Sequence, residues 1–288
     1  MNKNFKETFM KYFFFIISLI SVFALFLICY FIFSRGIPFV KEYGLKAFLF
    51  GKTWAPRNVP ASYGIVSMVV GSVYTTLGAI IIGLPIGLLT AIYMAFYANK
   101  KIYKILEPAV QLMAGIPSIV YGFFALVVMV PLIRSAFGGD GMNIITASLL
   151  LGIMILPTII SICDSSLRAV PKAFYQGSVA LGASKEISIF RVVVPAAKSG
   201  IISSFILGIG RAIGETMAVY LVAGNQPRIP ASLTQGVRTL TTNIVIEMAY
   251  ATPKHLQALI ATAMVLFIFI LIINTIFYFI KGSEKNYE

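Results

Sequence analysis

The sequence has few charged residues, one histidine and no recognisable catalytic motif, and each scarcity excludes a class of function. Charged residues make up 11% of the 288-residue chain, against about 25% in ordinary soluble domains. His255 is the only histidine, and HExxH, CxxC and G-x-S-x-G patterns are missing. A zinc site or a hydrolase nucleophile is therefore not indicated. A G-x-x-x-x-G-K-[ST] phosphate loop is missing too, so any ATP that this protein uses must be bound by another chain.

Cysteine is also scarce, and its two positions argue against a disulfide framework. Cys29 and Cys163 both fall inside apolar runs. Thiols in such runs are typically packed in a core or face lipid.

Apolar residues, by contrast, are abundant and arranged in long runs. They form 59% of the chain, and the mean hydropathy is +0.91. Crossing a bilayer takes roughly 20 apolar residues, and several runs are that long. We expect an all-α, polytopic membrane protein forming one domain over residues 1–288. Its six predicted spans are Tyr12–Phe33, Gly64–Tyr97, Glu107–Ile133, Ile144–Cys163, Gly200–Gly224 and Leu256–Ile280.

The net charge of +13 predicts orientation in the membrane rather than nucleic-acid binding. The lysines and arginines lie mainly in short segments between the apolar runs. More than half of these basic residues lie in four parts of the chain: the two termini, residues 99–104 and residues 164–198. This distribution places all four parts in the cytoplasm. No basic helix with interleaved aromatic residues stands apart from a span, so no nucleic-acid partner is expected.

The segment 164–198 is too long and too polar for a simple connection. Gly182 is suited to end a helix with positive φ, and Pro195 marks a second boundary, which predicts two short helices at a sharp angle. Long loops are usually functional, so we expect this segment to bind a cytoplasmic partner. The alternative is an ordinary connector.

The spacing within this segment resembles the "EAA" loop of ABC-importer permeases. The matching residues are Gln176-Gly177-Ser178, then Gly182 six residues after Gln176, and Val192-x-Val194-Pro195. Gln176 replaces the usual acid and Gly177 the usual first alanine, whereas Gly182 and Pro195 match. The resemblance implies a coupling helix that inserts into a cleft of an ATPase subunit.

Two further motifs, 114–123 (AGIPSIVYGF) and 210–219 (GRAIGETMAV), resemble phosphate-import permeases of the Pst type. A third, 237–251, which begins VRTLT, resembles their C-type subunit rather than its A-type partner. The resemblance implies the MetI-like bundle of type I ABC importers, in the cytoplasmic membrane. It also implies ATP-binding cassette ATPase subunits, a homologous A-type permease and an external phosphate-binding protein as partners. The chain itself would bind no cofactor. Import of another oxyanion, such as sulfate or molybdate, is the alternative, followed by a passive channel or a membrane enzyme.

Arg211 and Glu215 are two charged residues inside the fifth predicted span. Four positions apart on one helix, they would share a face and pair. Ionised groups at bilayer depth cost roughly 2.5–3.5 kcal/mol and usually face a cavity or the bundle interior. We therefore predict that Arg211 contacts a translocated oxyanion and that Glu215 holds Arg211 in place. A purely structural pair is the alternative.

Small and hydroxyl-bearing residues around these charges suggest weaker assignments. Gly210 and Gly214 would let another helix approach closely. Thr75 and Thr76 line the same path, or else donate to their own helix carbonyls.

Two Gly-x-Pro sequences and two residues near the last span complete the candidates. Gly83-x-Pro85 and Gly115-x-Pro117 are hinges or plain kinks. Glu247 is expected at the surface, with docking of the external binding protein as the alternative, and His255 is expected at the membrane interface.

Overall fold

The computed structural model describes residues 3–282 and is almost entirely helical. Helices satisfy their own backbone groups, which a bilayer cannot do. Among the described residues, five helices are long and apolar enough to cross a membrane. A sixth candidate is the pair Lys185–Ala196 and Lys198–Gly214, bent by 69°. The predicted all-α class is confirmed. Residues 283–288 of the predicted cytoplasmic tail lie outside the described part.

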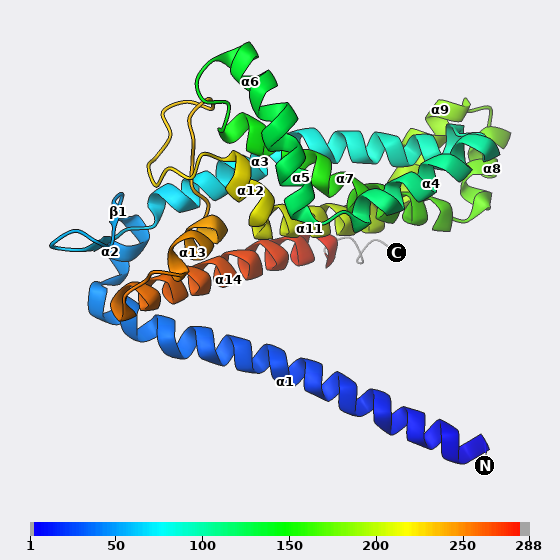
Figure 1. Ribbon diagram of the computed structural model, residues 1–288. Helices are drawn as coiled ribbons and strands as arrows, with labels where there is room; N and C mark the ends of the chain where they lie inside the picture. Colours follow the sequence, from blue (N-terminus) through cyan, green and yellow to red (C-terminus); the bar gives the residue numbers. More distant parts are fainter. Residues whose placement is uncertain (1–2, 283–288) are drawn as a thin grey trace.

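Figure 1 shows how the helices are arranged in the bundle. The helices that build its length are α1 (Lys3–Tyr43), α3 (Val66–Ile92), α4 (Lys100–Gly115), α7 (Ile144–Ala169), α11 (Lys198–Gly214) and α14 (Pro253–Gly282). The shorter helices are α2 (Leu45–Phe50), α5 (Ser118–Phe124), α6 (Val130–Phe137), α8 (Lys172–Ala180), α9 (Lys185–Ser188), α10 (Val194–Ala196), α12 (Met217–Val222) and α13 (Leu240–Met248). Three π-helical turns, at Tyr93–Tyr97, Ala125–Met129 and Ile189–Val193, join consecutive helices.

The centre of the bundle is the pair α3 and α7, which lie side by side. Small residues on α3 make this close approach possible. A Cβ built on Gly83 would lie 2.7 Å from Ile155 Cδ1, and one built on Gly87 would lie 2.7 Å from Ile159 Cγ2. Both isoleucines are buried. Larger side chains at these two glycines would push the helices apart, as expected of helix contacts inside a membrane.

Helix α1 leaves the bundle at a steep angle, and its C-terminal end is the part beside α14 (Figure 1). Its most apolar stretch is not buried by the rest of the chain. The helix also continues through Pro38 to Tyr43, ten residues beyond the predicted end of the first span.

Two of the predicted spans are interrupted. The first interruption falls at Gly115-x-Pro117, where the sequence predicts a hinge or kink, and the second corrects the sequence interpretation. The predicted third span, Glu107–Ile133, is broken at Ile116, whose backbone is extended with φ −70° and ψ 126°. Pro117 explains this break, because proline disfavours a helical conformation in the residue before it. The predicted fifth span, Gly200–Gly224, is broken at Glu215, which is also extended with φ −67° and ψ 134°.

The two ends of the bundle carry different structures. At one end, α8 and α9 form a compact helical turn (Figure 1). At the opposite end lies a two-stranded hairpin of β1 (Trp54–Ala55) and β2 (Ser62–Tyr63), in which Trp54 pairs with Tyr63 and Ala55 with Ser62. We call this opposite side the hairpin end.

Candidate functional site

The break after Gly214 separates the two charged residues that the sequence placed on one helix. Helix α11 ends at Gly214, and α12 begins at Met217. The carbonyls freed by the break have side-chain partners. Thr241 Oγ1 donates to the Glu215 carbonyl at 2.9 Å, and Thr216 Oγ1 donates to the Gly214 carbonyl at 3.2 Å. These two backbone carbonyls at the break therefore have hydrogen-bond partners within the chain.

Arg211 and Glu215 consequently have different partners, and their predicted pairing is wrong. Arg211 Nη1 donates to Thr158 Oγ1 of α7 at 3.3 Å. Glu215 Oε1 accepts from the Ala218 backbone N–H at 3.2 Å and so caps α12. No ion pair joins the two in the part of the chain that the structure describes. A guanidinium has five N–H donors, and the contact with Thr158 uses one, so Arg211 retains donors for an anion.

The break in the third predicted span faces the same region. Tyr121 Oη donates to the Met113 carbonyl at 2.9 Å, which satisfies a carbonyl freed by the Pro117 break. The half-helices beyond the two breaks pack closely, because a Cβ built on Gly122 of α5 would lie 2.8 Å from Ala218 Cα of α12. Two interrupted helices thus meet beside Arg211.

Three glycines of this region face open space within the chain. A Cβ built on Gly115, Gly210 or Gly214 would meet no atom within 4 Å. The close helix contact predicted for Gly210 and Gly214 is therefore not made by any described helix of this chain. Gly115 and Pro117 lie directly at a helix break, which is the geometry that a hinge requires.

The predicted path residues of α3 lie elsewhere. Thr75 is buried, and its hydroxyl donates to the Gly71 carbonyl at 2.9 Å, which is the alternative that the sequence left open. Thr76 is buried and lines an apolar groove with Ile209 and Ile213 of α11. Neither threonine has a hydrogen bond to Arg211 in the described structure. Helix α3 runs without interruption through Gly83 and Pro85. Gly83 therefore serves close helix packing rather than a hinge.

The segment 164–198 forms the two short helices that the sequence predicted. Gly182 has a φ of +88° and ends the turn after α8. Ser188 Oγ donates to Ser178 Oγ at 3.0 Å and ties α9 to α8. Gln176, Gly177 and Pro195 are exposed. Apolar side chains also project from this surface into solvent: Phe174, Val179, Leu181, Ile187 and Phe190. Leu181 is 91% exposed, which marks a surface suited to a protein partner.

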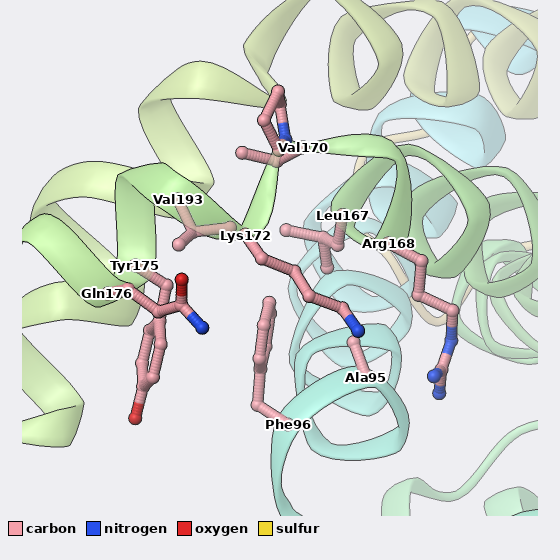
Figure 2. Close-up of a pocket in the computed structure, with 10 residues that line it drawn as sticks. Ala95, Phe96, Leu167, Arg168, Val170, Lys172, Tyr175, Gln176 and Val193 are labelled. Carbon is pink, nitrogen blue, oxygen red and sulfur yellow. The ribbon is translucent and has the colours of Figure 1, made fainter.

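A cavity of about 420 Å³ lies between this segment and the π-helical end of α3. Figure 2 shows the side chains of Lys172 and Gln176 directed into the same space as the Phe96 ring. Leu167, Val170 and Val193 complete an apolar lining around these polar groups. The cavity separates α8 from the bundle, so α8 is held mainly through its neighbours in the loop.

A comparison with known families accounts for this combination of features. The family model for binding-protein-dependent transport system inner membrane components matches residues 83–282. The chain belongs to this family. The matched range includes both interrupted spans, the helical loop and Arg211. Members are components of transport systems, so the chain is a multi-pass transport subunit and not an enzyme.

Similar curated proteins cover most of this inner membrane component. A probable ABC transporter permease protein, YqgH of Bacillus subtilis, is 38% identical over 71% of this chain and 67% of its own. A probable phosphate transport system permease protein PstC of Methanocaldococcus jannaschii is 31% identical over 94% of each chain. PstC of Xylella fastidiosa is 33% identical over 77% of this chain and 74% of its own. The resemblance to Pst-type permeases is thereby confirmed.

Solved structures confirm the fold of this inner membrane component. A chain from inward-facing conformations of the MetNI methionine ABC transporter matches with a TM-score of 0.57 at 20% identity. The match covers 76% of this chain and 94% of that one. A chain from an amino acid ABC transporter with histidines matches with a TM-score of 0.55 at 16% identity, over 76% and 92% of the two chains. The MetI-like importer bundle is therefore the architecture of this chain.

Sequence reasoning missed an ion pair near the helical loop. Asp164, at the end of the fourth predicted span, is buried and accepts from Arg168 Nε at 3.0 Å. Tyr103 Oη also donates to Asp164 at 3.0 Å, and Arg168 Nη2 donates to the Met94 carbonyl at 2.7 Å. Burial raises the pKa of Tyr103, and the hydrogen bond to Asp164 raises it further, so Tyr103 remains a donor. The spacing of Asp164 and Arg168, four positions apart, was the signal that pointed to this pair.

A second buried cluster, at the hairpin end, corrects the placement of Glu247 at the surface, and it also contains His255, which was expected at the membrane interface. The Glu247 carboxylate accepts from Arg238 Nη1, and its other oxygen accepts from Trp54 Nε1 at 2.8 Å. His255 Nε2 lies 2.8 Å from the oxygen that Trp54 already uses, in contact but not aligned for a hydrogen bond. Glu247 and His255 are 7% and 3% exposed. Trp54 lies 193 positions from Glu247 in the sequence, so no spacing pattern indicates the cluster.

Proposed function

We propose that this chain is the permease subunit of an ATP-driven importer that moves inorganic phosphate across the cytoplasmic membrane. The observation that carries the proposal is Arg211, a guanidinium at a helix break inside a predicted span, held by Thr158 and left with unused donors. Planar guanidinium groups bind phosphate oxygens in pairs. The relatives named phosphate transport system permeases support phosphate as the ion.

The arrangement supports a transient contact rather than a tight binding site. Arg211 offers hydrogen bonds, whereas the Glu215 carboxylate, capping α12, places negative charge close by. This negative charge repels the bound anion and so favours its release from Arg211. The open face at Gly210 and Gly214 is where a homologous second permease, of the A type, completes the path.

In this proposal, the energy for transport comes from ATP that other subunits bind. Two ATP-binding cassette subunits bind ATP and dock on α8 and α9, where Leu181 and Phe174 are exposed. Their closure moves this loop and tilts the spans attached to it. Both termini and α8–α9 lie in the cytoplasm, and the hairpin end faces outward, where an external phosphate-binding protein delivers the ion.

The proposal is tested by uptake into vesicles that contain the assembled transporter, ATP and the external binding protein. Labelled phosphate should accumulate only with ATP, and unlabelled phosphate should compete. Equal amounts of sulfate and molybdate should leave uptake unchanged. Competition by sulfate or molybdate without competition by phosphate would favour the alternative oxyanion and overturn the assignment.

The variant Arg211→Lys sharpens the same test. Lysine keeps the positive charge but lacks the planar fork. Uptake should fall in this variant while its ATPase subunits still co-purify. Unchanged uptake would remove the planar guanidinium from the proposal.

A further inference from the structure

Residues 223–252, which we call the outer segment, lie across α3 and α7 at the hairpin end. Within the segment, the Val237 backbone N–H donates to the Ala223 carbonyl at 2.7 Å. The Ile144 N–H at the start of α7 donates to the Gln235 carbonyl at 3.3 Å. A Cβ built on Gly71 of α3 would lie 2.4 Å from the Arg238 carbonyl oxygen. The outer segment therefore packs against α3 and α7 as part of the bundle.

The segment then turns inward as α13, whose first turn is buried. Thr239 caps this helix, and its side chain and that of Thr242 satisfy each other's backbone N–H. The Leu240 N–H donates to Ser72 Oγ of α3 at 3.0 Å. Thr242 and Asn243 are fully buried. This end of α13 is thus held at a definite depth in the bundle.

Thr241 connects α13 to the break beside Arg211. A helical threonine often donates to a carbonyl of its own preceding turn. Thr241 Oγ1 instead donates at 2.9 Å to the carbonyl of Glu215, which lies 26 positions earlier in the chain. That carbonyl has been freed by the end of α11. The hydroxyl therefore holds the broken span against α13.

The other end of α13 is anchored by the buried cluster around Glu247. Arg238, just before α13, contacts the Glu247 carboxylate, the Asn225 carbonyl at 3.0 Å and Asn243 Oδ1 at 3.1 Å. Trp54 and His255 bring the hairpin and α14 against the same carboxylate. Through these contacts, α13 connects the hairpin end to the break.

We propose that Thr241 is a positioning residue and that α13 is the outer gate of the path. The hydrogen bond from Thr241 to the Glu215 carbonyl keeps the region of Arg211 closed from the hairpin side, and its release opens that side. The inference rests on the proposed orientation and path, and it deepens them by naming what controls access to Arg211. One hydrogen bond shifts such an equilibrium roughly threefold to tenfold.

The test measures access to the break in the assembled transporter, in right-side-out vesicles. Gly214→Cys is a suitable reporter, because a side chain at Gly214 meets no atom of this chain. Cys29→Ser and Cys163→Ser remove the native thiols. A membrane-impermeant thiol reagent is added from outside, and the labelling rate of the reporter is recorded without ATP or phosphate.

Thr241→Val removes the hydroxyl and keeps the branched shape, and Thr262→Val is the matched control. Thr262 is a buried threonine of α14 whose hydroxyl donates only to the Ala258 carbonyl one turn earlier. We expect slow labelling in the parent and about threefold to tenfold faster labelling with Thr241→Val. Parental rates are expected with Thr262→Val and with Thr241→Ser, which restores the hydroxyl. Thr241→Ala is a second variant with the same expected result as Thr241→Val.

The proposal is overturned if labelling is already fast in the parent, or if Thr241→Val and Thr262→Val give equal rates. Rapid labelling with Thr241→Ser would likewise overturn it, because the hydroxyl would then be irrelevant. The readout contains no phosphate, so a failure of phosphate uptake and a failure of this gate are separate results.

Discussion

Trp54 and Glu247 are 193 positions apart in the chain, yet the Trp54 indole N–H donates to the Glu247 carboxylate at 2.8 Å. The contact joins the hairpin to the helix that leads into the last span. Because Arg238 and His255 reach the same carboxylate, one acidic residue holds three segments together. The hairpin end is therefore stabilised by a buried charge cluster as well as by apolar packing.

Replacing Glu247 by glutamine should destabilise the fold. The substitution keeps the shape but leaves the largely buried Arg238 side chain, 12% exposed, without its counter-charge, and the loss of a buried partner costs about 3–5 kcal/mol. Trp54 is the only tryptophan in the chain, so its fluorescence reports directly on this cluster. We expect a lower midpoint of thermal unfolding in detergent and a changed Trp54 emission.

The control for this variant is Glu42→Gln. Glu42 pairs with Lys254 at 2.8 Å, but both side chains are more than half exposed. Exposed pairs contribute little to stability, so the unfolding midpoint should stay the same. Equal effects of the two substitutions would show that the Glu247 cluster is not a stabilising element.

Arg211→Ala should abolish most transport without affecting assembly. Charge-assisted hydrogen bonds contribute about 1.5–3 kcal/mol each, so the initial uptake rate should fall roughly tenfold to a hundredfold. Arg211 lies away from the exposed face of α8 and α9, so the ATPase subunits should still co-purify. Full uptake by the alanine variant would remove Arg211 from the mechanism.

Gly182→Ala should weaken coupling between ATP hydrolysis and uptake. Gly182 has a φ of +88°, a region that costs an alanine roughly 1–2 kcal/mol. The turn between α8 and α9 should therefore shift and lower the uptake obtained per ATP hydrolysed. Asparagine tolerates positive φ better than alanine, so Gly182→Asn should recover part of the phosphate uptake per ATP hydrolysed. If both variants behave like the parent, the turn conformation has no role in coupling.

Gly83→Ala tests whether this position packs helices or acts as a hinge. The new methyl group would lie 2.7 Å from Ile155 Cδ1, and overpacking of this kind costs roughly 1–3 kcal/mol. The midpoint of thermal unfolding should therefore fall. Gly210→Ala is the control, because a Cβ there meets no atom within 4 Å, and the isolated chain should unfold at the parental temperature.

The helical class and most span positions follow from hydropathy, because burying free backbone groups in lipid is prohibitive. The breaks are harder to predict. Pro117 carries a clear local signal for the first one. The second break at Glu215 has no proline, and its stability depends on Thr241, a partner from another part of the chain. A continuous helix through Arg211 and Glu215 was therefore the natural prediction, and it was wrong.

The candidate site shows the same division between local and distant information. Gly182 and the two short helices were predictable, since the turn is specified by neighbouring residues. Charged residues inside an apolar run were also visible in the sequence. Their partners were not, because Thr158 lies 53 positions from Arg211. The burial of Glu247 and His255 depends on the hairpin folding back against α14, which no periodicity indicates.

The open face of α11 at Gly210 and Gly214 has a consequence for chains that are inserted into the membrane without a partner. A Cβ built on Gly210 or Gly214 would meet no atom of the chain within 4 Å, and both glycines stand beside a guanidinium that lipid tails do not solvate. A copy inserted without a companion would present that cation to acyl chains, at a cost of roughly 2.5–3.5 kcal/mol. We expect orphan copies to be degraded by membrane proteases, so the cellular amount of this chain should follow the amount of its companion.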